Sequence, residues 1–319
     1  MDVLSDVVAV TRTGRPRSAH VRWHAPWGQQ FAAVPGSAGF QIILQGSCWL
    51  LPPDAEPVQL DTGDVVFLPH GSGHTLADTP ETLLTAPDCA PDEGQQPYST
   101  YALDTVDRSG GGGPVTVVLC GAYELDPSRT HPLLRTLPDL IHLPAHPGRR
   151  PELRSAVELL AAELESPRLG TDAVVPALLD TLLLYILRIW FDEQPSQANT
   201  RGWAAALNDP PVTAALHAIH RDPAAPWTVA GLAEEAGLSR APFARRFAML
   251  VGQPPLGYLT WWRMTTAARL LRTSDVPLRS IAAQVGYTSE FAFAHAFKRT
   301  HGTAPGTYRR TEPSLLSKA

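Results

Sequence analysis

Histidines are the residues of this sequence whose type and spacing come nearest to a metal site. His74 lies in GDVVFLPHGSGHTLAD (63–78), the sharpest motif in the first half of the chain. A transition-metal site needs several converging nitrogen, sulfur or carboxylate ligands, and the apolar stretch 40–47 holds neither histidine nor glutamate. Other residues that could approach His74 in the folded chain are His20, His24, His70 and the cysteines. A lone imidazole predicts a hydrogen-bonded histidine and no cofactor, with metal or ligand contact at His74 as the alternative.

The thiols offer a second kind of chemistry. Cys48, Cys89 and Cys120 are widely spaced and form neither a disulfide framework nor a zinc pattern. Such cysteine usage suits a reducing cytoplasm. Cys120 follows an apolar strand and is expected to be a buried, inert thiol. Redox sensing is the alternative, because it depends on a thiol pKa that the sequence does not give.

Aromatic side chains could line a ligand pocket, since the mouth of a small β-barrel is a common binding place. The aromatic residues of this region are Trp23, Trp27, Phe31, Phe40 and Trp49. Core packing accounts for them, and ligand contact is the alternative. The residues that we assign to ligand contact are His24, Trp27, Trp49, His70 and His74.

Base recognition is the chemistry that a repeated motif near the C-terminus predicts. Residues 232–259 and 281–309 are two copies of one pattern, in which phenylalanines, glycines, prolines and a tyrosine recur at an offset of 50. Phe243 and Phe247 fix the core side of a helix. The residues that then point outward are Ala241, Arg245 and Ala248 in one copy and Phe291, His295 and Lys298 in the other. Arginine commonly reads guanine edges, and an apolar group can meet a thymine methyl.

The elements that must position these side chains follow from glycines and caps. In each copy a short helix ends at a glycine, Gly237 or Gly286, and a second helix begins at Ser239 or Ser289. Helix, turn and capped helix make a helix-turn-helix, whose second helix enters the major groove. Between the copies we expect a helix of about 18–20 residues, roughly 30 Å long. Because successive major-groove faces lie ~34 Å apart, both units could read adjacent grooves.

This paired unit resembles the DNA-binding domain of the AraC/XylS family of transcription regulators, most closely in GYTSEFAFAHAFKRTHGTAPGTYRR. The resemblance implies double-stranded DNA as a partner and RNA polymerase as a further one. His295 stands where an arginine often sits in the family. The residues assigned to DNA contact are Ser239, Arg240, Ala241, Arg245, Ser289, Glu290, Phe291, His295, Lys298 and Arg299.

The stretch around His74 resembles the second motif of cupins and the cupin-like sensor domain that precedes AraC-type DNA-binding domains. Gly63, Pro69, Gly71 and His74 carry that likeness. A catalytic cupin adds two histidines and a glutamate from a first motif, which this chain lacks. We therefore expect a sensor of an unknown small molecule or stress and no enzyme. The alternatives are a metal-dependent cupin enzyme fused to a DNA-binding domain and a thiol-based redox regulator.

Composition and charge agree with two functional parts. The 319 residues are 44% apolar, and the net charge of −5 conceals an asymmetry. Residues 209–319 hold 13 basic and 7 acidic residues, a net of +6, which leaves 13 basic and 24 acidic residues, a net of −11, in residues 1–208. A basic C-terminal third suits phosphate contact.

The helical segments between the two parts are expected to form a dimer interface. Residues 153–164 show helical apolar spacing, and 171–192 are apolar on nearly every side, so the second helix must be buried. Charges and Pro176 interrupt its most apolar stretch, and the N-terminus lacks a signal-peptide pattern. We expect a cytoplasmic homodimer without a membrane segment.

The predicted fold class is α+β: a cupin-like β-barrel, a helical dimerisation segment and an all-α domain with two helix-turn-helix units. The expected domains are 1–148 (sensor), 149–194 (dimerisation), 195–208 (linker), 209–310 (double helix-turn-helix) and 311–319 (tail).

Overall fold

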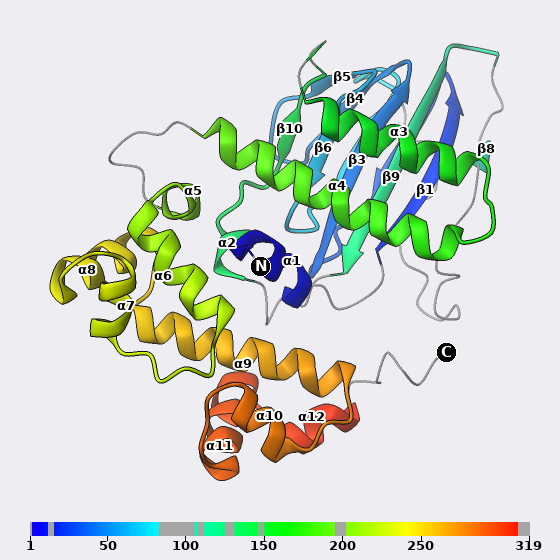
Figure 1. Ribbon diagram of the computed structural model, residues 1–319. Helices are drawn as coiled ribbons and strands as arrows, with labels where there is room; N and C mark the ends of the chain where they lie inside the picture. Colours follow the sequence, from blue (N-terminus) through cyan, green and yellow to red (C-terminus); the bar gives the residue numbers. More distant parts are fainter. Residues whose placement is uncertain are drawn as a thin grey trace. The chain divides into compact units, whose positions relative to one another are not determined.

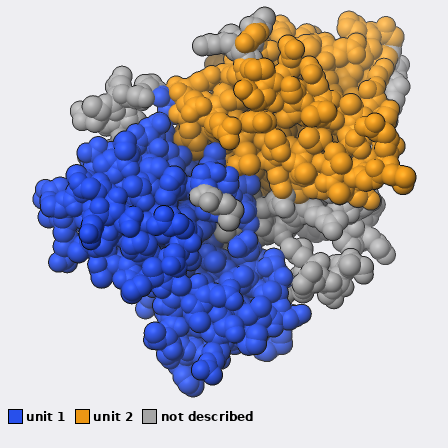
Figure 2. Space-filling view, viewed as in Figure 1, with its two compact units in different colours: residues 1–11, 131–136, 194–319 blue, residues 12–130, 137–193 orange. Residues whose placement is uncertain are grey.

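The computed structural model describes residues 2–11, 16–82, 106–107, 112–124, 131–145, 148, 150–194 and 202–311. Cys89, most of the predicted linker and most of the predicted tail lie outside the described residues. The chain divides into two compact units, coloured separately in Figure 2. Unit 1 consists of residues 1–11, 131–136 and 194–319, and unit 2 of residues 12–130 and 137–193.

Unit 2 contains two β-sheets (Figure 1). The larger sheet has the strand order β10-β6-β3-β9-β1-β8 and the smaller β2-β7-β4-β5, with every pair antiparallel except β1 and β8. The strands are β1 (Arg17–His24), β2 (Gly28–Phe31), β3 (Ser37–Gln45), β4 (Ser47–Leu51), β5 (Val58–Asp61), β6 (Val65–Leu68), β7 (His74–Ala77), β8 (Val106–Asp107), β9 (Val115–Glu124) and β10 (Ile141–Leu143). The predicted β-rich, cupin-like region is confirmed.

An apolar core fills the space between the two sheets. Alternate residues of each strand face it, because successive side chains of a strand point to opposite sides. The larger sheet contributes Trp23, Ile43 and Val66, and the smaller contributes Leu50 and Leu76, all almost fully buried. The interior of the predicted barrel is therefore a packed core in these residues.

Two helices cover the other face of the larger sheet (Figure 1). These are α3 (Pro151–Glu165) and α4 (Thr171–Glu193), which pack against each other. The Tyr123 hydroxyl on β9 donates a hydrogen bond to the carbonyl of Leu179 in α4 at 2.5 Å. By length and composition α4 could cross a membrane, but a core helix passes the same test, and eight residues of α4 are buried within the unit.

The burial of α4 corrects one expectation about the dimer. The segments predicted to form the dimer interface, 153–164 and 171–192, include Leu183 and Leu187. Both are buried inside unit 2, at 4% and 0% exposure. The α3–α4 pair thus buries its leucines against its own sheet, and a charge there would disrupt the unit itself.

Unit 1 is all-helical. Its helices are α1 (Val3–Thr11), α2 (Pro132–Arg135), α5 (Trp203–Leu207), α6 (Pro210–Arg221), α7 (Val229–Glu235), α8 (Arg240–Val251), α9 (Pro255–Thr273), α10 (Leu278–Gln284), α11 (Glu290–His301) and α12 (Pro305–Thr311). The spacer predicted between the two repeats is α9, a helix of 19 residues. The all-α domain with two helix-turn-helix units is confirmed.

The N-terminal helix α1 differs from the expectation that residues 1–148 form a cupin-like β-barrel. Asp2 caps α1, because its carboxylate accepts from the backbone N–H of Ser5 at 3.0 Å and from the Ser5 hydroxyl at 2.7 Å. Val3 and Val7 are one helical turn apart and buried. The helix packs on α6 and α9, so the structure groups residues 1–11, and also 131–136, with the helical unit instead of the expected domain 1–148.

Candidate nucleic-acid interface

The two helix-turn-helix units share the same turn. After α7, the N–H of Gly237 bonds to the carbonyl of Glu234, and the N–H of Leu238 bonds to that of Ala233 at 2.9 Å. After α10, Gly286 and its successor repeat both bonds. This pair of bonds is the Schellman motif, which needs a left-handed residue. Gly237 and Gly286 supply it, with φ of +64° and +79°.

The second helix of each unit buries phenylalanines on one side. Phe243 and Phe247 of α8, and Phe293 and Phe297 of α11, are all 0% exposed. The opposite side is open to solvent. Its exposed residues are Arg240, Ala241, Arg245 and Met249 on α8 and Glu290, Phe291, His295, Lys298 and Arg299 on α11. Each DNA-contact residue predicted on the two helices is thus exposed.

Three details of these faces depart from the helical projection. Ala248 is half-buried. Met249, which was not singled out, is 50% exposed and widens the apolar part of the α8 face. Arg246 is held by an ion pair, because its Nε donates to Asp209 at 2.7 Å and its Nη2 contacts the same carboxylate. Of the two arginines in the middle of α8, Arg246 is thus held by Asp209, whereas Arg245 has no such ion pair among the described residues.

The two cap serines act differently. The Ser289 hydroxyl accepts from the N–H of Ala292 at 3.4 Å, as expected of an N-cap. Ser239 occupies the same position before α8, but its hydroxyl makes no capping bond. An exposed hydroxyl at a helix N-terminus suits a phosphate oxygen. Ser239 is therefore the better placed of the two serines for backbone contact.

The spacer α9 belongs to both cores. Its first half, including Tyr258 and Leu259, is buried on the side of α7 and α8, which α9 contacts. Its second half, including Met264 and Leu271, is buried with Phe293 of the second unit. A helix of 19 residues is roughly 28 Å long. A single rigid element thus connects the two exposed faces.

Comparison with known proteins gives this geometry a family. A family model described as a cupin matches residues 2–192, and one described as a helix-turn-helix domain matches residues 232–311. A putative AraC-like transcription regulator of Streptomyces lividans is 36% identical over 311 residues, covering 97% of this chain and 98% of that protein. The chain belongs to the AraC family of transcription regulators.

This AraC-family regulator is also similar to two further proteins. The HTH-type transcriptional regulator AlkR of Acinetobacter baylyi is 30% identical over 312 residues, covering 97% of this chain and 99% of that protein. The solved DNA-binding domain of AdpA, in complex with a target DNA, is 32% identical and covers 35% of this chain and 99% of its own, with a TM-score of 0.32.

A buried hydrogen-bond chain in unit 1 was not foreseen. The backbone N–H of Leu133 donates to Nδ1 of His131 at 2.9 Å, so the proton of this imidazole lies on Nε2. That Nε2–H faces the Tyr258 hydroxyl at 3.0 Å. The hydroxyl proton then goes to Nε2 of His220 at 2.6 Å, and Nδ1–H of His220 faces the Asp6 carboxylate at 3.2 Å. One backbone amide thus fixes every proton along the chain.

Burial keeps this chain neutral at its centre. Desolvation lowers the pKa of His131 and of His220, although Asp6 acts in the opposite direction on His220, and desolvation raises the pKa of Tyr258. Tyr258 and His131 are 0% exposed, so no substrate reaches them. The four side chains tie α1 and the residue before α2 to α6 and α9.

The cupin-like motif shapes a turn. Gly71 has φ of +65°, and a Cβ there would lie 2.1 Å from the carbonyl of Val34. His74 is buried, and burial lowers its pKa to about 4. Its Nε2 lies 3.0 Å from Nε2 of Gln41 and its Nδ1 lies 3.4 Å from the carbonyl of Ser72, so both ring nitrogens are engaged. Among the residues that the structure describes, no three acidic, histidine or cysteine side chains gather as metal ligands.

The five residues assigned to ligand contact do not converge. Trp27 stacks on Trp23 in the core, with ring centroids 4.5 Å apart. His74 also faces the interior, where it stacks on Phe31 at 4.7 Å. His24 and Trp49 alternate with core residues of β1 and β4, so they lie on the outer faces. His70 bonds instead to the carbonyl of Leu137 at 2.9 Å.

The described thiols are set apart. Cys48 is buried on β4, and burial raises the pKa of its thiol to about 12, which makes it inert. Cys120 is half-buried on β9, in the other sheet, and its thiol lies 3.6 Å from the carbonyl of Ala19. Cys120 is thus less buried than the sequence predicts, and the inertness of its thiol stays a prediction.

Proposed function

We propose that this AraC-family regulator reads DNA with the exposed faces of α8 and α11. In this proposal Arg245, Phe291 and His295 contact base edges. Arg245 and His295 lie midway along the faces opposite the buried phenylalanines, and Phe291, at the start of α11, is 90% exposed. The residues that contact phosphates are those at the helix starts and flanks, Ser239, Arg240, Ser289, Lys298 and Arg299. Ala241 and Glu290 lie beside the bases.

The observation that carries this proposal is the equivalence of the two units. Both have the same Schellman turn, the same pair of fully buried phenylalanines and the same kind of exposed face. Arginine, lysine and histidine outnumber the single acid, Glu290, on these faces. Such a surface suits the negative potential of a DNA groove.

Arg245→Ala tests the proposal at one side chain. We expect a loss of about 1–3 kcal/mol in binding free energy on the cognate duplex and relaxed preference at one or two base pairs. Binding is measured with the full chain on cognate and scrambled duplexes. Arg221→Ala is the control, since Arg221 is also exposed but lies at the end of α6. Equal losses for both variants, or none for either, would mean that Arg245 reads no base.

We further propose that unit 2 senses a small molecule and does not catalyse a reaction. The hydrogen bonds of both ring nitrogens of His74 support this, because the Gln41 amide donates to the Nε2 lone pair that a metal ion would need. The regulator would then act in the cytoplasm, as a homodimer, with RNA polymerase as a further partner.

A further inference from the structure

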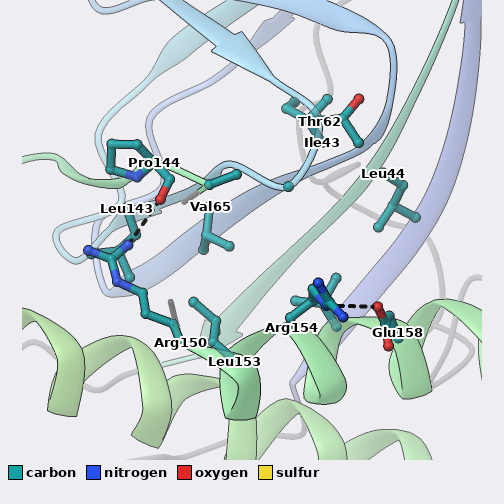
Figure 3. A pocket seen from close by; sticks show the side chains of 13 residues that line it. Ile43, Leu44, Thr62, Val65, Leu143, Pro144, Arg150, Leu153, Arg154 and Glu158 are labelled. Carbon is teal, nitrogen blue, oxygen red and sulfur yellow. Dashed lines mark hydrogen bonds and ion pairs between the residues drawn. The ribbon is translucent and has the colours of Figure 1, made fainter. Parts of the chain in front are cut away.

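A cavity of about 460 Å³ opens on unit 2 between α3 and the strands of the larger sheet (Figure 3). Leu44, Val65 and Leu143 line it from the sheet, and Leu153 and Val157 line it from α3. This volume lies within the range of small-molecule sites, which are mostly apolar with a few polar groups. None of the residues that we first assigned to ligand contact lines it.

The charged residues that line the cavity are two arginines, Arg150 and Arg154, and one glutamate, Glu158. Figure 3 shows Arg150 beside Pro144 and the Arg154–Glu158 pair further along α3. That pair is 3.2 Å apart, and its side chains are 76% and 65% exposed. Exposed pairs contribute little to stability, so Arg154 can exchange Glu158 for another anion.

Arg150 is held at the cavity by an unusual backbone. It precedes α3 with φ of +58°, a left-handed conformation that glycine adopts far more readily than arginine. Its Nη1 donates to the carbonyl of Pro144 at 3.2 Å, and its Nη2 pairs with Glu193. The side chain of Arg150 is only 14% exposed, whereas that of Glu193 is 48% exposed. A strained arginine with a loosely held partner suits ligand binding better than stability.

We propose that this cavity binds a small monocarboxylate with an apolar body. The apolar body lies against the leucine and valine side chains, and the carboxylate accepts hydrogen bonds from Arg150 and Arg154. Guanidinium and carboxylate match in geometry and charge. This inference rests on the proposed sensing function and names its site and class of ligand.

The carboxylate of the ligand competes with Glu193 for Arg150. Glu193 is the last residue of α4, and the chain passes from it into unit 1. Ligand binding therefore breaks the ion pair that joins the end of α4 to the start of α3. Glu193 directly precedes the segment that leads into unit 1, so the ligand changes the contacts of the residue at which that segment begins. A change at this point can shift an equilibrium only by the difference in affinity between the paired and released states.

The test is calorimetric titration of the full chain with three probes of equal chain length: octanoate, octanol and octylamine. We expect octanoate to bind one site and to bind about tenfold or more tightly than octanol, because charged hydrogen bonds are strong. Octylamine should bind more weakly than octanol. Equal binding of octanoate and octanol would overturn the proposal, since a merely apolar cavity gives that result.

Two variants give opposite predictions. Arg150→Gly removes the guanidinium at a position whose backbone suits glycine, so the fold is kept and octanoate affinity should fall by about tenfold or more. Glu193→Gln removes the competitor and should raise octanoate affinity by about threefold. Arg168→Ala, which removes an arginine paired with Glu163 outside the cavity, should change neither. Unchanged affinity in Arg150→Gly, or a loss in Glu193→Gln, would contradict the assignment.

Binding to DNA is measured separately on the same proteins. A chain that binds octanoate selectively but no specific duplex would refute the DNA-binding proposal and leave the cavity assignment intact. A chain that binds a specific duplex but does not distinguish octanoate from octanol would refute only the cavity assignment.

Discussion

Tyr258 is the central residue of the buried hydrogen-bond chain in unit 1. Its hydroxyl lies between two imidazole nitrogens, at 3.0 Å from His131 and 2.6 Å from His220. This hydroxyl accepts a hydrogen bond from one imidazole and donates one to the other, so it satisfies two buried ring nitrogens. Buried polar groups left unpaired cost about 1–3 kcal/mol each.

Tyr258→Phe should therefore destabilise the protein by about 2–4 kcal/mol, since the ring is kept but both imidazoles lose a partner. Urea denaturation of the full chain measures the change. Tyr287→Phe is the matched control, because Tyr287 is half-buried and packs on Phe293 in the second unit. If Tyr258→Phe were no more destabilising than the control, the proton arrangement that we assign would be wrong.

Single residues were predictable where the backbone dictates them. Gly237, Gly286 and the two cap serines could be placed from the sequence, because helix ends impose a left-handed residue and a polar cap. The Asp6–His220–Tyr258–His131 chain could not be predicted. Its members are up to 252 positions apart in the sequence, and only tertiary packing brings them together.

At the scale of elements, α9 decides how the two DNA-contacting faces are related. Two added residues rotate one face by about 200° relative to the other. Insertion after Ala268 would damage the second core, because Ala268 and Leu271 are both buried in it. The boundary between the two cores lies between Arg263, which bonds to the carbonyls of Pro223 and Ala225, and Met264.

Insertion of Ala-Ala between Arg263 and Met264 should abolish specific DNA binding while nonspecific binding persists, because the basic surface is unchanged. Affinity for cognate and scrambled duplexes is measured side by side. The same insertion between Gln197 and Ala198, in the predicted linker, is the control and should keep specific binding. Retained specificity in the α9 variant would show that one helix-turn-helix reads DNA alone.

The sequence predicts best those strands and helices whose apolar residues follow a clear pattern. The apolar runs 40–44, 48–51, 65–68 and 115–119 predict strands and lie within β3, β4, β6 and β9, and the spacer helix has the expected length. α1 was missed because its valines favour strands in general, although Asp2 and Ser5 form a cap and Val3 and Val7 share one face. The cavity under α3 could not be foreseen either, since it joins α3 to Leu44 on β3, more than a hundred residues earlier in the chain.

At the scale of the whole molecule, the predicted dimer needs an interface on the surface of unit 2. The leucines expected at the interface are buried within unit 2, but α3 and α4 leave other apolar side chains exposed. Leu159 is 60% exposed and Val174 is 41% exposed. Because each helix exposes an apolar residue, we propose that the predicted dimer interface lies on the outer side of this pair.

We expect the full chain to sediment as a dimer and Leu159→Glu to sediment as a folded monomer, because an unpaired charge in an apolar interface costs several kcal/mol. Leu183→Glu, by contrast, should unfold unit 2. Circular dichroism separates the two outcomes. A monomer for the unaltered chain would refute the dimer and leave the DNA-binding proposal untouched.

Selection of binding sites from a random duplex library tests the central claim, that one chain reads DNA with two equivalent helices. The full chain should select two short blocks of conserved bases whose centres lie about one helical turn, roughly 10 base pairs, apart. Arg245→Ala should weaken the base preference in one block and Phe291→Ala that in the other, because these side chains lie on α8 and α11 respectively. A single block, or two blocks that both variants blur alike, would contradict the account.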